Sequence, residues 1–138
     1  MARSEQGEFT MMLFVCSQGK IRSRTAEVLC LIGGIDARSC GTDEDAIVPI
    51  SDHLIRCADV IVCMEDHHIS TLRKMDFMHM DGKESIVLGI EDIYKPFDPL
   101  LVKNLIESLN IKCPVASAAI MRGEASGICR EWIASQSR

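Results

Sequence analysis

Short apolar runs alternate with helical stretches along this sequence, and no other feature constrains the fold as strongly. Residues 11–15 form a continuous apolar run and residues 58–64 a nearly continuous one, the pattern of strands buried on both faces of a parallel sheet. Residues 35–40 and 85–88 are predicted as two further strands. The sequence therefore predicts an α/β fold in which a small four-stranded parallel sheet is flanked by helices.

Helices are predicted between these strands from apolar spacing and from residues that begin and end helices. They cover residues 25–32, 51–57, 65–74 and 98–109. Ser51 and Asp98 are the expected N-caps of two of them, and Pro99 suits the first helical position after Asp98.

The length of 138 residues suits one core and is too short for two. We expect a single domain over residues 11–110, preceded by an N-terminal extension of residues 1–10. Residues 111–138 are predicted as a tail or a terminal helix of unknown role, because Gly123 and Gly127 interrupt the helical pattern.

Composition and charge argue against several classes of function. No apolar run approaches the roughly 20 residues that a membrane-spanning helix needs, and a net charge of −5 is unlike that of a nucleic-acid-binding surface. We therefore expect neither a membrane nor a nucleic-acid partner. Seven cysteines without a C-x-x-C pair, and residues 1–10 without an apolar leader segment, predict a protein of the reducing cytoplasm. The four histidines do not pair with close-set cysteines, so no metal site is expected.

One loop carries the clearest chemical signal. Cys16 closes the first predicted strand, five residues follow, and then come Arg22, Ser23 and a helix. A short loop between a strand and a helix N-terminus can turn its backbone N–H groups inward and bind an anion, and Gly19 permits the left-handed turn that this requires. The pattern predicts a phosphate-binding loop made of residues 17–22.

Each side chain in this pattern has a specific use in phosphate chemistry. The planar fork of Arg22 can bind two phosphate oxygens, which lysine cannot do. The positive surroundings favour the thiolate form of Cys16, which can attack phosphorus and form a phosphocysteine, and Ser23 can donate a hydrogen bond to that sulfur. The alternative is that Cys16 is an ordinary buried cysteine and Arg22 a surface charge.

These segments resemble the low-molecular-weight protein tyrosine phosphatase family, particularly its short bacterial-type members. Residues 13–18, Arg22–Ser23 and residues 25–27 are similar to the catalytic loop and following helix of that family. Residues 39–42 and 58–65 are similar to its Ser-Ala-Gly-Thr segment and its third strand, so that the resemblance covers about residues 11–110 in order.

The resemblance implies a cofactor-independent phosphomonoesterase, with Cys16 as the nucleophile and Arg22 as the phosphate-binding arginine. It also implies a general acid from the loop after the fourth strand, and Asp92 occupies that place. Asp98 is the rival candidate, although its position before Pro99 favours a capping role. The implied substrate-binding residues are Ser17, Gln18, Gly19, Lys20, Ile21, Ser23 and Tyr94, the last as a pocket wall. The expected substrate is a phosphotyrosine protein or a small aryl phosphate.

The sequence departs from the family pattern at the loop and beside it. Ile21 stands where longer members carry a second cysteine, so Cys16 cannot be protected by a neighbouring disulfide. Lys20 adds positive charge at the rim. Residues 43–45 contain no aromatic side chain that could form the opposite wall of a phosphotyrosine slot.

Three other functions remain open from the sequence. An arsenate reductase of the same fold needs further cysteines for a disulfide relay, and none lies between Cys63 and Cys113, so Cys113 or Cys129 would have to fold over the site. A non-catalytic phosphate-binding module would keep the loop without turnover. A phosphomonoesterase for small metabolites or nucleotides would share the chemistry and differ in pocket shape.

Overall fold

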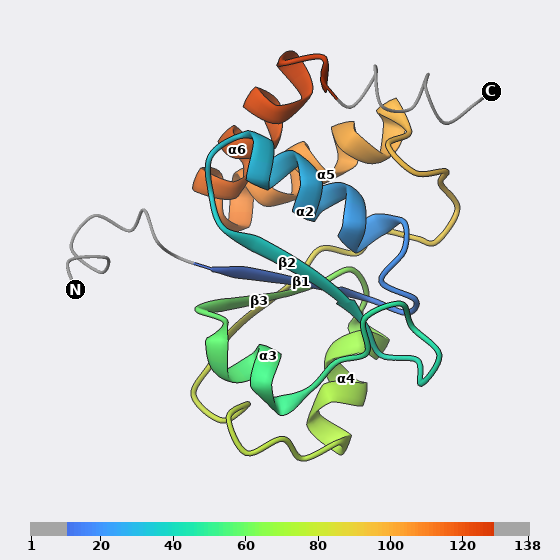
Figure 1. Ribbon diagram of the computed structural model, residues 1–138, viewed down its shortest axis with the longest axis vertical. Coiled ribbons are helices and arrows are strands. Elements are labelled where there is room, and N and C mark those ends of the chain that lie inside the picture. Colours follow the sequence, from blue (N-terminus) through green and yellow to red (C-terminus); the bar gives the residue numbers. More distant parts are fainter. Residues whose placement is uncertain (1–10, 129–138) are drawn as a thin grey trace.

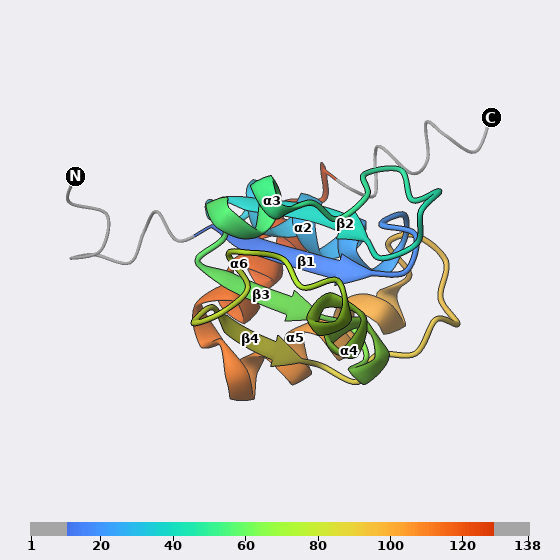
Figure 2. The ribbon, with the colours of Figure 1, turned by 90° about the horizontal axis from the view of Figure 1, so that it is seen from below.

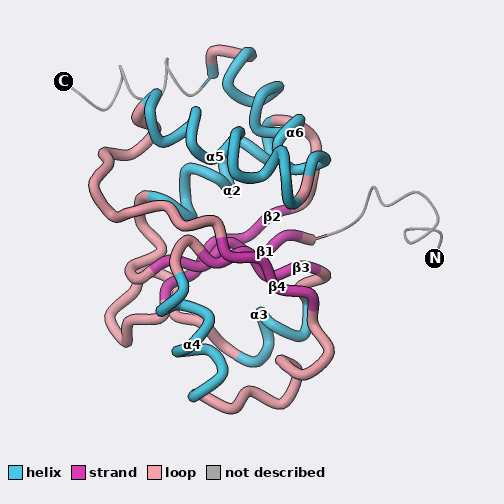
Figure 3. Tube along the Cα trace, turned by 180° about the vertical axis from the view of Figure 1, so that it is seen from behind, coloured by secondary structure: helices cyan, strands magenta, loops and turns pink. Residues whose placement is uncertain are grey.

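A computed structural model describes residues 11–128 and shows a four-stranded sheet between two layers of helices (Figure 1, Figure 3). The strands are β1 (Met12–Cys16), β2 (Ala37–Gly41), β3 (Val60–Cys63) and β4 (Glu84–Val87). The helices are α2 (Arg22–Ile32), α3 (Asp52–Cys57), α4 (Asp66–Lys74), α5 (Pro99–Lys112) and α6 (Pro114–Ala125).

The sheet has the strand order β2-β1-β3-β4, and every pair is parallel (Figure 2). Helices α2, α5 and α6 cover one face, and α3 and α4 cover the other (Figure 1). This confirms the predicted α/β fold. Ser51 and Asp98 accept hydrogen bonds from the backbone N–H groups of Leu54 and Leu100, so both predicted N-caps are confirmed as well.

Alternate residues of β1 supply the two hydrophobic cores. Met12, Phe14 and Cys16 belong to the core beneath α2, α5 and α6, whereas Leu13 and Val15 belong to the core beneath α3 and α4. All five side chains are buried, as expected for a central parallel strand. The side chain of Cys16 therefore belongs to the face that α2 covers. No helix among residues 11–128 is long and apolar enough to cross a membrane.

Helix α6 lies against α2 through two glycines. A Cβ atom on Gly33 would lie 1.9 Å from the carbonyl oxygen of Ala119, and one on Gly123 would lie 2.2 Å from that of Leu29. Both distances are too short for real atoms, so glycine is what lets the two backbones meet. Gly123 thus lies inside a helix, where the sequence predicted an interruption.

We expect Gly123→Ala to lower the free energy of unfolding by about 3 kcal/mol, the cost of overpacking a tight contact. Alanine ordinarily favours a helix over glycine by about 1 kcal/mol, so the sign of the effect is diagnostic. Ala118→Ser, an exposed change on the same helix, is the control. Chemical denaturation measures both, and a Gly123→Ala protein as stable as the native chain would contradict this packing.

Candidate active site

The carboxyl ends of the four parallel strands lie at one edge of the sheet, where ligands of such folds bind. Residues 17–21 leave β1 there and lead directly into α2. The segment after β2 holds this loop in place, because the N–H groups of Thr42 and Asp43 donate to the carbonyl oxygens of Cys16 and Ser17, each at 2.9 Å. The loop is therefore covalently continuous with β1 and is also hydrogen-bonded to the segment that follows β2.

Two polar groups lie within hydrogen-bond distance of the Cys16 sulfur. The Ser23 hydroxyl lies 3.0 Å from Sγ, and the Gly19 N–H donates to Sγ at 3.1 Å. Gly19 has φ +67°, and a Cβ there would lie 2.9 Å from the carbonyl carbon of Cys40, so this position needs glycine. Helix α2 begins at Arg22 with no side-chain cap and no acidic residue in its first turn. Its positive end is left for an anion.

Arg22 is buried, and hydrogen bonds from one end of its guanidinium fix its position. Its Nη1 donates to Oε1 of Glu65 and, at 2.8 Å, to the carbonyl oxygen of Ile90. These bonds use both hydrogens of Nη1, so the donors that remain for an oxyanion are on Nε and Nη2, a fork that suits two phosphate oxygens. The hydrogen bond from Arg22 lowers the pKa of the Glu65 carboxyl below its ordinary value, so Glu65 is a carboxylate at neutral pH.

A small cavity brings together Cys16, Arg22 and Asp92, the three residues predicted from the sequence to be catalytic. Its volume is about 150 Å³, and it is lined by Cys16, Gln18, Lys20, Ile21, Arg22 and Asp92. Asp92 Oδ1 lies 3.8 Å from Arg22 Nε, and its side chain is 62% exposed. The arrangement joins a thiol, an arginine fork and a solvent-accessible carboxyl, which are the groups needed to bind a phosphate, attack it and move a proton.

The side chains of Ser17 and Gln18 anchor the loop. Ser17 Oγ lies 3.0 Å from Nε2 of His68, and the Gln18 amide donates to Asp43 at 2.6 Å and to Asp45 at 3.2 Å. Gln18 also lines the cavity, whereas Ser17 is not among the described residues that do so. The acidic residues after β2 therefore fix the shape of the loop.

The side chains of Asp98 and Tyr94 form hydrogen bonds with residues outside the cavity. Asp98 accepts a hydrogen bond from the Leu100 N–H as the N-cap of α5. Tyr94 packs partly against the core, and its hydroxyl accepts a hydrogen bond from the Asn104 amide. Neither is among the described residues that line the cavity. The role of Tyr94 as a pocket wall stays a prediction.

His68 is a buried residue that the sequence analysis missed. Burial, followed by the nearby His67 and Arg22, lowers its pKa from 6.5 to about 4, so the ring is neutral near pH 7. Its Nδ1 accepts the Glu65 N–H at 3.0 Å, so Nε2 carries the proton and donates to Ser17. His68 thus links α4 to the loop.

This geometry predicts a pH-dependent stability. The pKa of His68 is lower in the folded chain than in the unfolded one, so the unfolded chain binds a proton first as the pH falls. The stabilisation is complete above about pH 6.5 and is lost toward about pH 4. It amounts to about 3 kcal/mol at ~1.4 kcal/mol per pKa unit.

Chemical denaturation across this pH range tests the prediction. The His68→Gln variant, whose amide can still donate to Ser17, should lose less stability between pH 6.5 and pH 4 than the native chain. Parallel curves for the two proteins would show that His68 does not carry the effect.

The sequence analysis assigned no role to Glu65 or His68. Glu65 follows β3 by two residues, at the same edge of the sheet as Cys16. Ligand atoms of Glu65, His67 and His68 lie within 4.8 Å of one another, the spacing of a metal site. However, Glu65 holds Arg22 and both ring nitrogens of His68 are hydrogen-bonded, so this cluster organises the loop.

Three of the other described cysteines are poorly suited to react at this site. Burial raises the pKa of Cys63 to about 12 and also raises that of Cys40. Cys113 Sγ lies 4.0 Å from Sδ of Met12, which begins the strand that Cys16 ends. Cys113 is therefore at the opposite end of β1, and Cys129 lies outside the described residues.

The chain matches no protein-family model and no curated protein by sequence. By structure, it is similar to the low-molecular-weight phosphotyrosine phosphatase VcLMWPTP-2 from Vibrio cholerae O395, with a TM-score of 0.55 and 16% identity over 85% of this chain and 95% of that chain. The YwlE arginine phosphatase from Geobacillus stearothermophilus gives a TM-score of 0.52 and 15% identity over 86% and 96% of the two chains.

A thioredoxin-dependent arsenate reductase from Corynebacterium glutamicum is similar as well, with a TM-score of 0.54 and 16% identity over 83% of this chain and 67% of that chain. The chain therefore has the fold that low-molecular-weight phosphatases share with this arsenate reductase. The fold implied by the sequence resemblance is confirmed.

Proposed function

We propose that the protein is a cysteine-dependent phosphatase of the low-molecular-weight type. The observation that carries the proposal is the 150 Å³ cavity at the N-terminus of α2, in which Cys16, Arg22 and Asp92 meet. The similarity to two phosphatases of this fold supports it. The described cysteines give little support to a disulfide relay, which disfavours arsenate reduction.

Two displacements at phosphorus make up the proposed reaction. The Cys16 thiolate attacks phosphorus, the bond from phosphorus to the ester oxygen breaks, and Asp92 gives its proton to the departing oxygen. A water molecule then attacks the phosphocysteine and gives a proton to Asp92. The P–S bond breaks, and phosphate leaves with the thiolate restored. Arg22 and the loop amides bind the phosphoryl oxygens throughout, and no cofactor takes part.

We assign phosphotyrosine proteins and small aryl phosphates as the substrates. The name of the Vibrio cholerae protein supports this assignment, whereas YwlE is an arginine phosphatase. We also assign the protein to the cytoplasm, which the six free cysteines of the described chain support.

The test is hydrolysis of p-nitrophenyl phosphate, phosphotyrosine and phosphoarginine at mildly acidic pH with a chelator present. We expect turnover of the two aryl esters, undiminished by the chelator, and little release from phosphoarginine. Thermal stabilisation by phosphate without turnover of any substrate would instead indicate a phosphate-binding module.

A further inference from the structure

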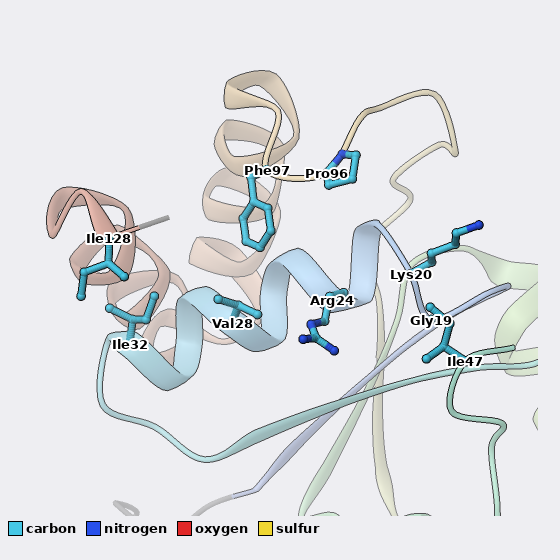
Figure 4. A pocket seen from close by; sticks show the side chains of 9 residues that line it. All are labelled: Gly19, Lys20, Arg24, Val28, Ile32, Ile47, Pro96, Phe97 and Ile128. Carbon is cyan, nitrogen blue, oxygen red and sulfur yellow. The ribbon is translucent and has the colours of Figure 1, made fainter. Parts of the chain in front are cut away.

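A second, larger hollow runs along α2 beside the cavity (Figure 4). Its volume is about 480 Å³. Ile32 and Ile128 lie at one end, Val28 and Phe97 in the middle, and Gly19, Lys20 and Ile47 at the other end (Figure 4). We call it the α2 groove. None of the proposed chemistry uses its apolar side chains.

The α2 groove is continuous with the candidate active site. Lys20 lines both the groove and the 150 Å³ cavity, and Gly19, another groove residue, donates its N–H to Cys16 Sγ. A molecule with its phosphate against Cys16 can therefore extend past Lys20 into the groove without leaving the protein surface.

The groove has a positive charge on a chain that is negative overall. Its charged lining residues are Lys20 and Arg24, and no carboxylate is among the described residues that line it. The whole chain carries −5. Arg24 is half exposed and lies 3.7 Å from Glu27, which also accepts a hydrogen bond from Ser39, so the exposed part of the guanidinium is open to another anion. The charge suits an acidic ligand.

Apolar side chains stay exposed in the groove. Ile47 and Ile128 are 64% and 53% exposed. Phe97 has φ +58°, a left-handed conformation that costs energy for a bulky residue, and its ring points from its loop toward α2 (Figure 4). Its N–H donates to Thr25 on α2 at 3.2 Å, which fixes this loop against the helix.

We propose that the α2 groove binds the polypeptide segment next to the phosphorylated residue of a protein substrate. The occupant is an extended segment with a carboxylate near Lys20 and Arg24 and apolar side chains against Val28, Phe97 and Ile128. This inference rests on the proposed function and adds where a phosphoprotein substrate binds beside its phosphorylated residue. The cavity alone would serve any small phosphate ester.

The length of the groove sets the length of the recognised segment. It follows α2, whose 11 residues span about 16 Å at 1.5 Å per residue. An extended chain rises about 3.3 Å per residue. About five residues beside the phosphorylated one therefore reach the far end of the groove.

The experiment compares kcat/KM for phosphotyrosine peptides and for p-nitrophenyl phosphate. Two peptides carry an aspartate followed by leucines within five residues of the phosphotyrosine, one on the C-terminal and one on the N-terminal side. A third has glycine and serine flanks. We expect one acidic, apolar peptide to exceed the glycine–serine peptide by about tenfold, the effect of roughly 1.4 kcal/mol of binding.

Variants then locate this preference. Ile128→Asp and Arg24→Glu, both at exposed positions away from the cavity, should abolish the peptide preference and leave p-nitrophenyl phosphate hydrolysis unchanged. Ile111→Asp changes an exposed isoleucine outside the groove and should change neither. Equal hydrolysis of all peptides, or loss of activity toward both kinds of substrate, would overturn the groove proposal alone.

Two further outcomes distinguish a failure of the proposed function from a failure of the proposed occupant of the groove. No turnover of p-nitrophenyl phosphate by the native chain would overturn the proposed function, and this inference with it. A rise in peptide hydrolysis in Ile128→Asp would show that the chain itself, or a second copy, occupies the groove, and would overturn the proposed occupant.

Discussion

Cys16→Ser should abolish hydrolysis of aryl phosphates, with kcat lower by about 10⁴-fold or more, the scale on which removing a nucleophile acts in hydrolases. A serine hydroxyl is a far weaker nucleophile than a thiolate in the same loop. The two groups within hydrogen-bond distance of Sγ, the Gly19 N–H and the Ser23 hydroxyl, remain in the variant. Phosphate should therefore still raise its melting temperature while turnover is lost.

Cys57→Ser is the matched control for this prediction. Cys57 is an exposed free cysteine on α3, away from the cavity, so its replacement should leave kcat within twofold of the native value. A Cys16→Ser protein that retains a tenth of the native activity would mean that another group attacks phosphorus. Mass spectrometry of an acid-quenched reaction should find phosphate on Cys16 of both the native protein and Cys57→Ser.

The sequence was sufficient for most of the fold because apolar runs and caps are local signals. The strands and the helices α3, α4 and α5 lie within a few residues of their predicted bounds. Helix α2 begins at Arg22, earlier than predicted, and its N-cap residue, Ile21, makes no side-chain hydrogen bond. A helix start of this kind has no sequence signature, and the uncapped end is what leaves room for an anion.

Helix α6 was harder to predict because its stability depends on tertiary contacts. Gly123 disfavours a helix locally, yet it allows the close approach to Leu29 on α2 that buries Ala116 and Ile120 in the core. A contact between segments nearly a hundred residues apart is invisible to local patterns.

The candidate site likewise has features that local sequence predicts and features that depend on tertiary contacts. The spacing of Cys16 and Arg22 and the capping position of Asp98 could be read from the sequence. The partners of Arg22 could not, because Glu65 and Ile90 come from the ends of two other strands, and only the parallel sheet brings them to one edge.

The second large effect is expected from Asp92→Asn. The amide cannot give or take the proton that the reaction moves, so kcat should fall by about 10³-fold, within the usual range for a lost general acid. The loss should be greater for phenyl phosphate than for p-nitrophenyl phosphate, because the poorer leaving group depends more on protonation. Initial rates for the two esters across the pH range measure both effects.

Asp98→Ala provides the decisive comparison, because it removes the rival carboxyl. Asp98 caps α5 through the Leu100 N–H, so this variant should lose about 1 kcal/mol of stability and keep its turnover within twofold. Asp92 lines the cavity at 3.8 Å from Arg22, so Asp92→Asn should show the opposite combination, full stability and lost turnover. If Asp98→Ala loses turnover and Asp92→Asn keeps it, Asp98 is the general acid. The loop that carries Asp98 must then close over the cavity during the reaction.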